Sequence, residues 1–166
     1  MPYYEMQIRL LLGIYYIWKR SDTNQYPQKF NQIISIINQS IDISNIYGRK
    51  LTTINGFYLK GIAYLKNNDS IHALDNYCIT ADYLYKYLND CDDYYRWSFF
   101  WIDFAILCRV SKKNMINLSR IKDYNLRNKL KMILEMDENT FNKYCNNYIP
   151  LTAITDKSHS LSFPKI

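Results

Sequence analysis

Apolar residues recur at spacings of three and four along almost the whole chain, which is the pattern of amphipathic helices. Only four glycines and four prolines occur in 166 residues. Few helix breakers and a regular helical period predict an all-α fold of helices joined by short links. A chain of this length buries enough surface to fold without a disulfide or a metal ion.

The helices are expected to form three successive antiparallel hairpins, because short links favour antiparallel neighbours. The period and the capping residues predict helices at 3–19, 28–47, 51–66, 70–88, 94–110 and 111–136, and a short one at 138–146. Gly48 is expected to end the second helix, Asp69 or Ser70 to cap the fourth, Asp92 or Asp93 to cap the fifth, and Ser111 to cap the sixth, with a break near Asp123. Residues 1–147 are expected to form one helical-repeat domain. Residues 148–166 have no helical period, which predicts an extended or disordered tail, laid against the domain or a partner if it is ordered.

Gly61 lies in the middle of an apolar helical run, where glycine costs about 1 kcal/mol relative to alanine. Close approach of a neighbouring helix would offset that cost. Ala73 and Tyr77, four residues apart in the next helix, are the candidates for the residues opposite it. The alternative is that the helix merely tolerates the glycine.

Residues 54–87 resemble a tetratricopeptide repeat, a helix–turn–helix unit of about 34 residues. The positions that carry the resemblance are Phe57, Gly61 and Tyr64 in the first helix and Ala73 and Tyr77 in the second. The chain departs from the family pattern at Lys60, Thr80 and Tyr85. The resemblance implies a short right-handed superhelix of stacked hairpins, with only the middle hairpin close to the family pattern.

Proteins of this family usually bind a peptide or a helix of a partner and carry out no chemistry. By the family's spacing, the binding groove would contain Asn55, Tyr58, Ile62 and Leu65. Tyr58 and Ile62 stand where receptors of C-terminal carboxylates have Lys and Asn, so an apolar or aromatic peptide, or another helix, is the expected ligand. The alternative is that these residues simply pack against the first helix, expected at 3–19, and leave no groove.

Aromatic residues are dense from Tyr83 to Phe104, and they are expected in the core, or else on a partly exposed contact surface. Asp103 lies within this apolar stretch and needs a partner if it is buried. The candidate partners are Arg96, Arg109 or a tyrosine hydroxyl.

Positive charge is concentrated in residues 109–131, where eight Lys and Arg residues oppose Asp123 alone, giving +7 in a chain of net charge +6. The candidate contacts for nucleic-acid phosphates or an acidic partner are Arg109, Lys112, Lys113, Arg120, Lys122 and Arg127. The alternative is a solvated helix face.

No glycine-rich phosphate loop or GxSxG motif occurs in the sequence, and the four cysteines form no CxxC pair. We therefore expect no catalysis, no cofactor, no metal site and free thiols. The apolar runs are too short to span a membrane, and Glu5 precedes the first of them. These features predict an intracellular protein, in the cytoplasm or alternatively in a mitochondrion.

The expected function is that of a non-enzymatic scaffold or adaptor that binds another protein, as a subunit of a larger assembly. An RNA-associated subunit of a ribonucleoprotein, such as an organellar ribosome, that uses residues 109–131 is the alternative. A viral or parasite effector that sequesters a host protein is a further alternative. The sequence does not identify the partner or the oligomeric state.

Overall fold

The computed structural model describes residues 26–87 and 97–147. The helices are α2 (Tyr26–Ile46), α3 (Lys50–Lys66), α4 (Ser70–Tyr87), α6 (Ser98–Val110), the 3₁₀ helix η1 (Leu118–Arg120), α7 (Tyr124–Glu135) and α8 (Glu138–Asn147). These residues include no strand, so the all-α prediction is confirmed for the described part of the chain. The predicted helix at 3–19, the link at 88–93 with its capping aspartates, and the tail at 148–166 lie outside the described residues.

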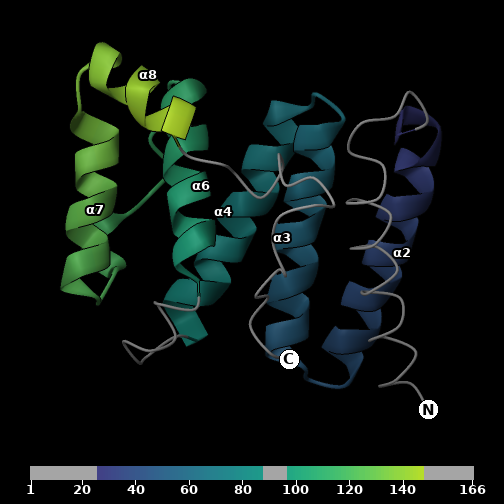
Figure 1. Cartoon of the computed structure of the whole chain (residues 1–166). Coiled ribbons are helices and arrows are strands. Elements are labelled where there is room, and N and C mark those ends of the chain that lie inside the picture. Colours follow the sequence, from purple (N-terminus) through teal and green to yellow (C-terminus); the bar gives the residue numbers. More distant parts are fainter. Residues whose placement is uncertain (1–25, 88–96, 148–166) are drawn as a thin grey trace.

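Each helix packs on the next one along the chain, so that α2, α3, α4, α6 and α7 follow one another across the molecule (Figure 1). The short α8 lies across the end of α6 and α7. This sequential packing gives a repeat-like helical fold.

Three helices end in the same way, with a residue in the left-handed region and two backbone hydrogen bonds that close the last turn. Gly48 (φ 65°) ends α2, Asn68 (φ 59°) ends α3 and Lys112 (φ 54°) ends α6. After α3, the Asp69 N–H donates to the Tyr64 carbonyl at 2.9 Å and the Asn68 N–H donates to the Leu65 carbonyl at 3.0 Å. The predicted stop at Gly48 is confirmed.

Asp69 then caps α4, because its carboxylate accepts a hydrogen bond from the His72 N–H at 3.1 Å. This is one of the two capping residues that the sequence suggested. The links between α2, α3 and α4 are therefore short, and α3 and α4 form the antiparallel hairpin that the sequence predicted.

The predicted helix at 111–136 is wrong over its first half. Ser111 ends α6 instead of starting a new helix, and residues 111–123 are irregular apart from η1. The break near Asp123 is confirmed, since the Asp123 carboxylate caps α7 by accepting from the Leu126 N–H at 2.7 Å. The side chains of Asn114 and Asn117 accept from the Ile116 and Ser119 N–H groups, which favours turns over helix.

As a result, α6 and α7 run parallel and do not form the third antiparallel hairpin that was expected. Arg109 near the end of α6 donates a hydrogen bond to the carbonyl of Ile133 near the end of α7, at 2.9 Å. Asn117, midway along the connection, has already returned to α4, where its N–H donates to the Tyr85 hydroxyl at 3.0 Å. Residues 111–123 thus carry the chain back along α6 before α7 begins (Figure 1).

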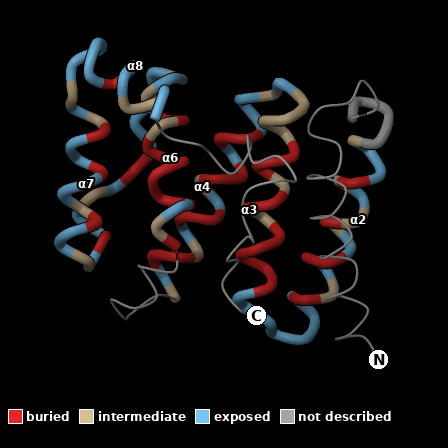
Figure 2. Tube along the Cα trace, in the orientation of Figure 1, coloured by how far each residue is buried: buried red, intermediate tan, exposed pale blue. Residues whose placement is uncertain are grey.

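The core runs through α2, α3, α4 and α6, whose facing surfaces are buried, while much of α7 and α8 is exposed (Figure 2). Its largest fully buried side chains are Trp101, Tyr77, Phe100, Phe104, Ile33, Ile37, Ile54 and Leu59. The helix α7 contributes only Leu126, Leu130 and Ile133 to the buried set. Most of the apolar burial that stabilises the fold therefore comes from the middle of the molecule.

Gly61 lies at the crossing of α3 and α4, as predicted. A Cβ atom at this position would lie 2.4 Å from Cδ1 of Tyr77 and 3.4 Å from the Ala73 carbonyl oxygen. The Tyr77 ring cannot easily move away, because it packs against Tyr58, Phe100 and Phe104. The close approach of Tyr77 accounts for the glycine.

Candidate protein-binding site

Asn55, Tyr58 and Ile62 lie one turn apart along α3 and form a surface that we call the Asn55 face. Asn55 is 1% exposed and Tyr58 is 3% exposed, and Ile62 is fully buried. Leu65, the fourth predicted groove residue, is half-buried. The Asn55 face therefore differs from the open groove that the sequence suggested.

Tyr58 is held by aromatic rings from two other helices. Its ring centroid lies 5.6 Å from that of Tyr77 in α4, 5.2 Å from that of Phe100 in α6 and 6.1 Å from that of Trp97. The large rings of α6 fill the space beside α3, which is the physical reason why Tyr58 is buried. Contact of Tyr58 and Ile62 with a partner stays a prediction.

The Tyr58 hydroxyl donates a hydrogen bond to Oδ2 of Asp103 in α6, at 3.3 Å. Asp103 is 6% exposed, so this bond joins two buried polar groups on facing helices. The prediction that a tyrosine hydroxyl partners Asp103 is confirmed. Arg109, another candidate, points instead toward α7 and α8, and Arg96 lies outside the described residues.

Asn55 has an unusual environment for a polar residue. Neither its Oδ1 nor its Nδ2 atom has a hydrogen-bond partner among the residues that the structure describes. Leaving a buried polar group unpaired costs roughly 1–3 kcal/mol. A primary amide offers both a donor and an acceptor, so Asn55 is equipped to pair with a peptide group of another segment.

Tyr144, near the end of α8, is half-buried. Burial raises the pKa of Tyr144 in α8, and the nearby charges of Cys145 and Asp103 add to this effect.

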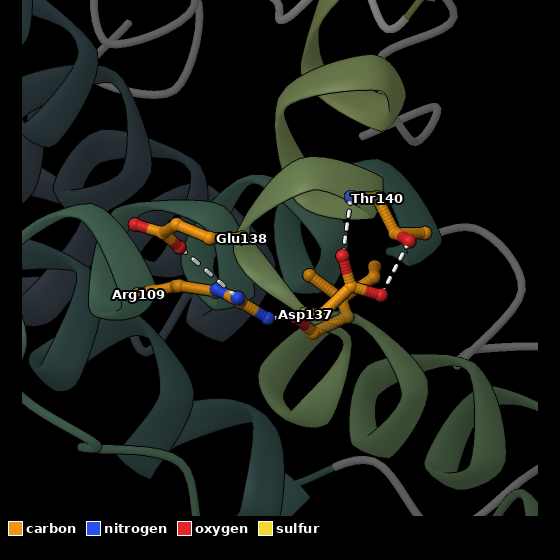
Figure 3. Close-up of polar contacts among 5 residues, drawn as sticks. Arg109, Asp137, Glu138 and Thr140 are labelled. Atoms are coloured by element: carbon orange, nitrogen blue, oxygen red, sulfur yellow. Dashed lines mark hydrogen bonds and ion pairs between the residues drawn. The ribbon is translucent and has the colours of Figure 1, made fainter.

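Arg109, one of the predicted phosphate contacts, is used inside the protein. Besides the Ile133 carbonyl, its guanidinium contacts Oε2 of Glu138 at 3.3 Å (Figure 3) and lies 4.4 Å from the Phe141 ring centroid. Next to it, Asp137 caps α8 by accepting from the Thr140 N–H at 2.9 Å and from its hydroxyl at 2.6 Å. These hydrogen bonds lower the pKa of Asp137. Arg109 therefore fastens α8 to α6 and α7.

The other predicted phosphate contacts are either used in contacts within the protein or exposed to solvent. Arg127 donates twice to the Ile121 carbonyl, at 2.9 and 2.5 Å, and so stabilises the irregular segment. The Arg120 guanidinium lies 4.4 Å from the Tyr85 ring centroid, although its residue is exposed. Lys112, Lys113 and Lys122 are exposed.

The aromatic residues between Tyr83 and Phe104 mostly belong to the core, as predicted. Among the described members, the buried ones are Tyr85, Trp97, Phe100, Trp101 and Phe104, and the half-buried ones are Tyr83 and Tyr87. Phe99 alone among the described members is highly exposed, at 53%. Tyr94 and Tyr95 lie outside the described residues.

Sequence reasoning missed the role of Tyr85, which it noted only as a departure from the repeat pattern. Its hydroxyl accepts from the Asn117 N–H, and burial raises its pKa to about 12. No local signal could reveal this bond, since the two residues are distant in the sequence. The sequence does carry a signal for turns between α6 and α7, namely the asparagines at 114 and 117 and the aspartate at 123.

Acid–base and metal-ligating groups are scattered in the described part of the chain. Within residues 26–87 and 97–147, no three His, Cys, Asp or Glu side chains gather where they could hold a metal ion. His72 contacts Asp69 at 2.6 Å on an exposed helix end. Cys78, Cys108 and Cys145 are thiols, and burial raises the pKa of Cys108 to about 11.

None of the helices in the described ranges is both long and apolar enough to cross a membrane. Comparison of the chain with protein-family models, with curated proteins and with solved structures found no match.

Proposed function

We propose that this protein is a non-enzymatic helical-repeat scaffold that binds an extended segment of a partner protein at the Asn55 face. The observation that carries the proposal is the Asn55 amide, which is buried and has no hydrogen-bond partner among the described residues. An extended peptide exposes backbone N–H and C=O groups that match such an amide. The resemblance of residues 54–87 to a tetratricopeptide repeat also supports the binding of a partner peptide.

The surroundings of Asn55 suggest the chemistry of the peptide. Ile62 and the half-buried Leu65 continue the face along α3, and they favour apolar or aromatic side chains in the ligand. The Tyr58–Asp103 hydrogen bond fixes α3 against α6, which keeps the face rigid. A rigid face lowers the entropic cost of binding.

The test has two steps. Peptides are selected from a displayed random library for binding to the full chain, and their affinity for the Asn55→Leu variant is then measured. Selected peptides should carry apolar or aromatic residues and should bind the variant at least about tenfold more weakly, which corresponds to one lost hydrogen-bonded pair. The matched control is Asn76→Leu, which changes a buried asparagine whose Nδ2 donates to the His72 carbonyl within α4. Equal binding to both variants would contradict the proposal.

RNA binding is the second candidate, and the exposure of Lys112, Lys113 and Lys122 is what favours it. Contacts to phosphates would make affinity fall steeply with salt, whereas a peptide at the Asn55 face predicts weak salt dependence. Changing Lys112, Lys113, Arg120 and Lys122 to Gln should abolish RNA binding and leave peptide binding intact. Retention of RNA affinity in that variant would exclude this surface.

A further inference from the structure

The helix ends of this protein form two edges of different character. The turn between α2 and α3, the end of α4 and the starts of α6 and α7 lie along the lower edge in Figure 1. Two contacts join parts of this edge, because the Lys50 ammonium lies 5.3 Å from the Tyr87 ring centroid and the Arg120 guanidinium lies 4.4 Å from that of Tyr85. We call it the basic edge, and it comprises residues 46–51, 84–87, 97–100 and 118–124.

Large apolar side chains are exposed along the basic edge. Three of them follow one another around the turn between α2 and α3, where Ile46 is 76% exposed and Tyr47 and Leu51 are exposed as well. Phe99 is exposed at the start of α6, and Tyr124 is exposed at the start of α7. Covering such side chains with a partner surface is favourable, because it removes apolar area from water.

Basic side chains accompany these apolar ones. Asp123 is the only acidic residue among the described residues of the basic edge, which therefore carries +4. The link at 88–96 lies outside the described residues and contains three Asp and one Arg, so the edge and the link together carry +2. The five basic residues of the edge are all exposed, and they are Arg49, Lys50, Lys86, Arg120 and Lys122.

The opposite edge is close to neutral. It comprises residues 66–69, 109–113 and 135–147, at the turn between α3 and α4, the end of α6, and α8 (Figure 1). These residues include five basic and four acidic side chains. The excess of positive charge at one edge favours an anionic partner there.

The mixture of side chains at the basic edge indicates which anionic partner fits. Lys and Arg residues are attracted to the anionic headgroups of a bilayer, and neighbouring apolar side chains enter the boundary between headgroups and acyl chains. RNA would use the positive charge and the aromatic rings, but it would leave the aliphatic Ile46 and Leu51 in water. Because the exposed apolar residues are spread over three helix ends, a broad bilayer surface can meet them together.

We propose that the basic edge lies on the surface of a membrane that contains anionic lipids. The turn between α2 and α3 enters the headgroup boundary, and Arg49, Lys50 and Lys86 face the anionic headgroups. This inference goes beyond the proposed function, because the residues of the Asn55 face take no part in it.

Flotation of the full chain with lipid vesicles tests the inference. The protein should float with vesicles of equal parts phosphatidylcholine and phosphatidylserine, and binding should be at least about tenfold weaker to phosphatidylcholine alone or at high salt. Equal binding to both kinds of vesicle, or no binding to either, would overturn the inference.

A pair of triple variants with equal charge locates the contact. Changing Arg49, Lys50 and Lys86 to Gln should weaken binding to the phosphatidylserine vesicles at least about tenfold. The matched control changes Lys66, Lys112 and Lys113 to Gln, which removes the same charge from the opposite edge and should change binding by less than about threefold. Equal losses in the two variants would mean that net charge alone governs binding, and the basic edge would then be wrong as the contact.

The apolar contribution has its own test. Ile46→Ser with Tyr47→Ser should weaken vesicle binding severalfold, whereas Ile71→Ser with Val110→Ser, at exposed positions elsewhere, should leave it unchanged. Binding that both pairs leave unchanged would overturn the placement of the turn at the headgroup boundary.

Other occupants of the basic edge give different results. RNA affinity that depends on Arg49, Lys50 and Lys86, without vesicle binding, would assign the edge to RNA and overturn the inference. Self-association in the absence of lipid that the same triple variant abolishes, again without vesicle binding, would assign it to a second copy of the chain. Binding of selected peptides should be the same in the triple variant and the unmodified protein, which keeps this inference separate from the proposed function.

Discussion

The helix pairs α3–α4 and α6–α7 are joined in different ways. Between α3 and α4 the chain turns in three residues, and the helices run antiparallel with Gly61 against Tyr77 at their crossing. Between α6 and α7 it takes residues 111–123 to return along α6, and the helices run parallel. The first pair is determined by local turn chemistry, and the second by contacts between residues distant in the sequence.

The two pairs also differ in how they are held together. The first is packed by buried aromatic rings, with Tyr77 surrounded by rings of α3 and α6. In the second, α7 buries only Leu126, Leu130 and Ile133, and Arg109 of α6 donates to the Ile133 carbonyl of α7. We therefore expect substitutions in the first pair to affect global stability and those in the second to act more locally.

The largest effect is expected at the crossing of α3 and α4. Gly61→Ala would place a methyl group 2.4 Å from Cδ1 of Tyr77, so it should lower the free energy of unfolding by roughly 1–3 kcal/mol. Chemical denaturation followed by circular dichroism measures this loss. Lys60→Ala, at a half-buried position of the same helix, is the control. Stabilisation by about 1 kcal/mol, as helix propensity alone predicts, would show that the crossing is loose.

An intermediate effect is expected from Arg109→Gln, which removes the guanidinium that joins α6, α7 and α8. The loss should be about 1–2 kcal/mol, mainly from the Ile133 carbonyl bond and the Phe141 contact, because Glu138 is 82% exposed. Amide exchange should accelerate most in residues 138–147. Lys112→Gln, at an exposed position, serves as the reference. If amide exchange in Arg109→Gln accelerated equally through α3 and α4, the distinction between the two helix pairs would be wrong.

The smallest effect is expected from Tyr85→Phe, which takes away the hydroxyl that accepts from the Asn117 N–H. Below pH 10 the variant should be less stable by about 1 kcal/mol. Burial raises the pKa of Tyr85 from 10.0 to about 12, so the folded state keeps its proton where the unfolded state loses it. The advantage of the unmodified protein should therefore shrink as pH rises from 10 toward 12.

Urea denaturation at pH 7 and pH 11 measures this difference. Tyr124→Phe, at an exposed position of α7, is the control. Its stability difference from the unmodified protein should not shrink between pH 7 and pH 11. A stability difference that stays constant with pH would mean that Tyr85 does not keep its proton in the fold.

Much of the helical structure follows from the sequence alone, because it depends on short-range interactions. Apolar periodicity located α2, α3, α4, α6 and α8, and Gly48 and Asp69 marked helix ends through their own backbone and side-chain chemistry. Gly61, Ala73 and Tyr77 predicted the crossing of α3 and α4, since a glycine in an apolar helix implies a close neighbour. The tyrosine partner of Asp103 was also among the expected ones.

The direction of α7 and the closure of the Asn55 face were decided only by tertiary structure. The path of residues 111–123 depends on the Tyr85–Asn117 bond and on Arg127, which no local pattern reveals. The resemblance to a tetratricopeptide repeat implies that Asn55 and Tyr58 face a groove, but the rings of α6 bury Tyr58. Helical period determines which side of a helix a residue occupies, whereas burial depends on what packs against that side.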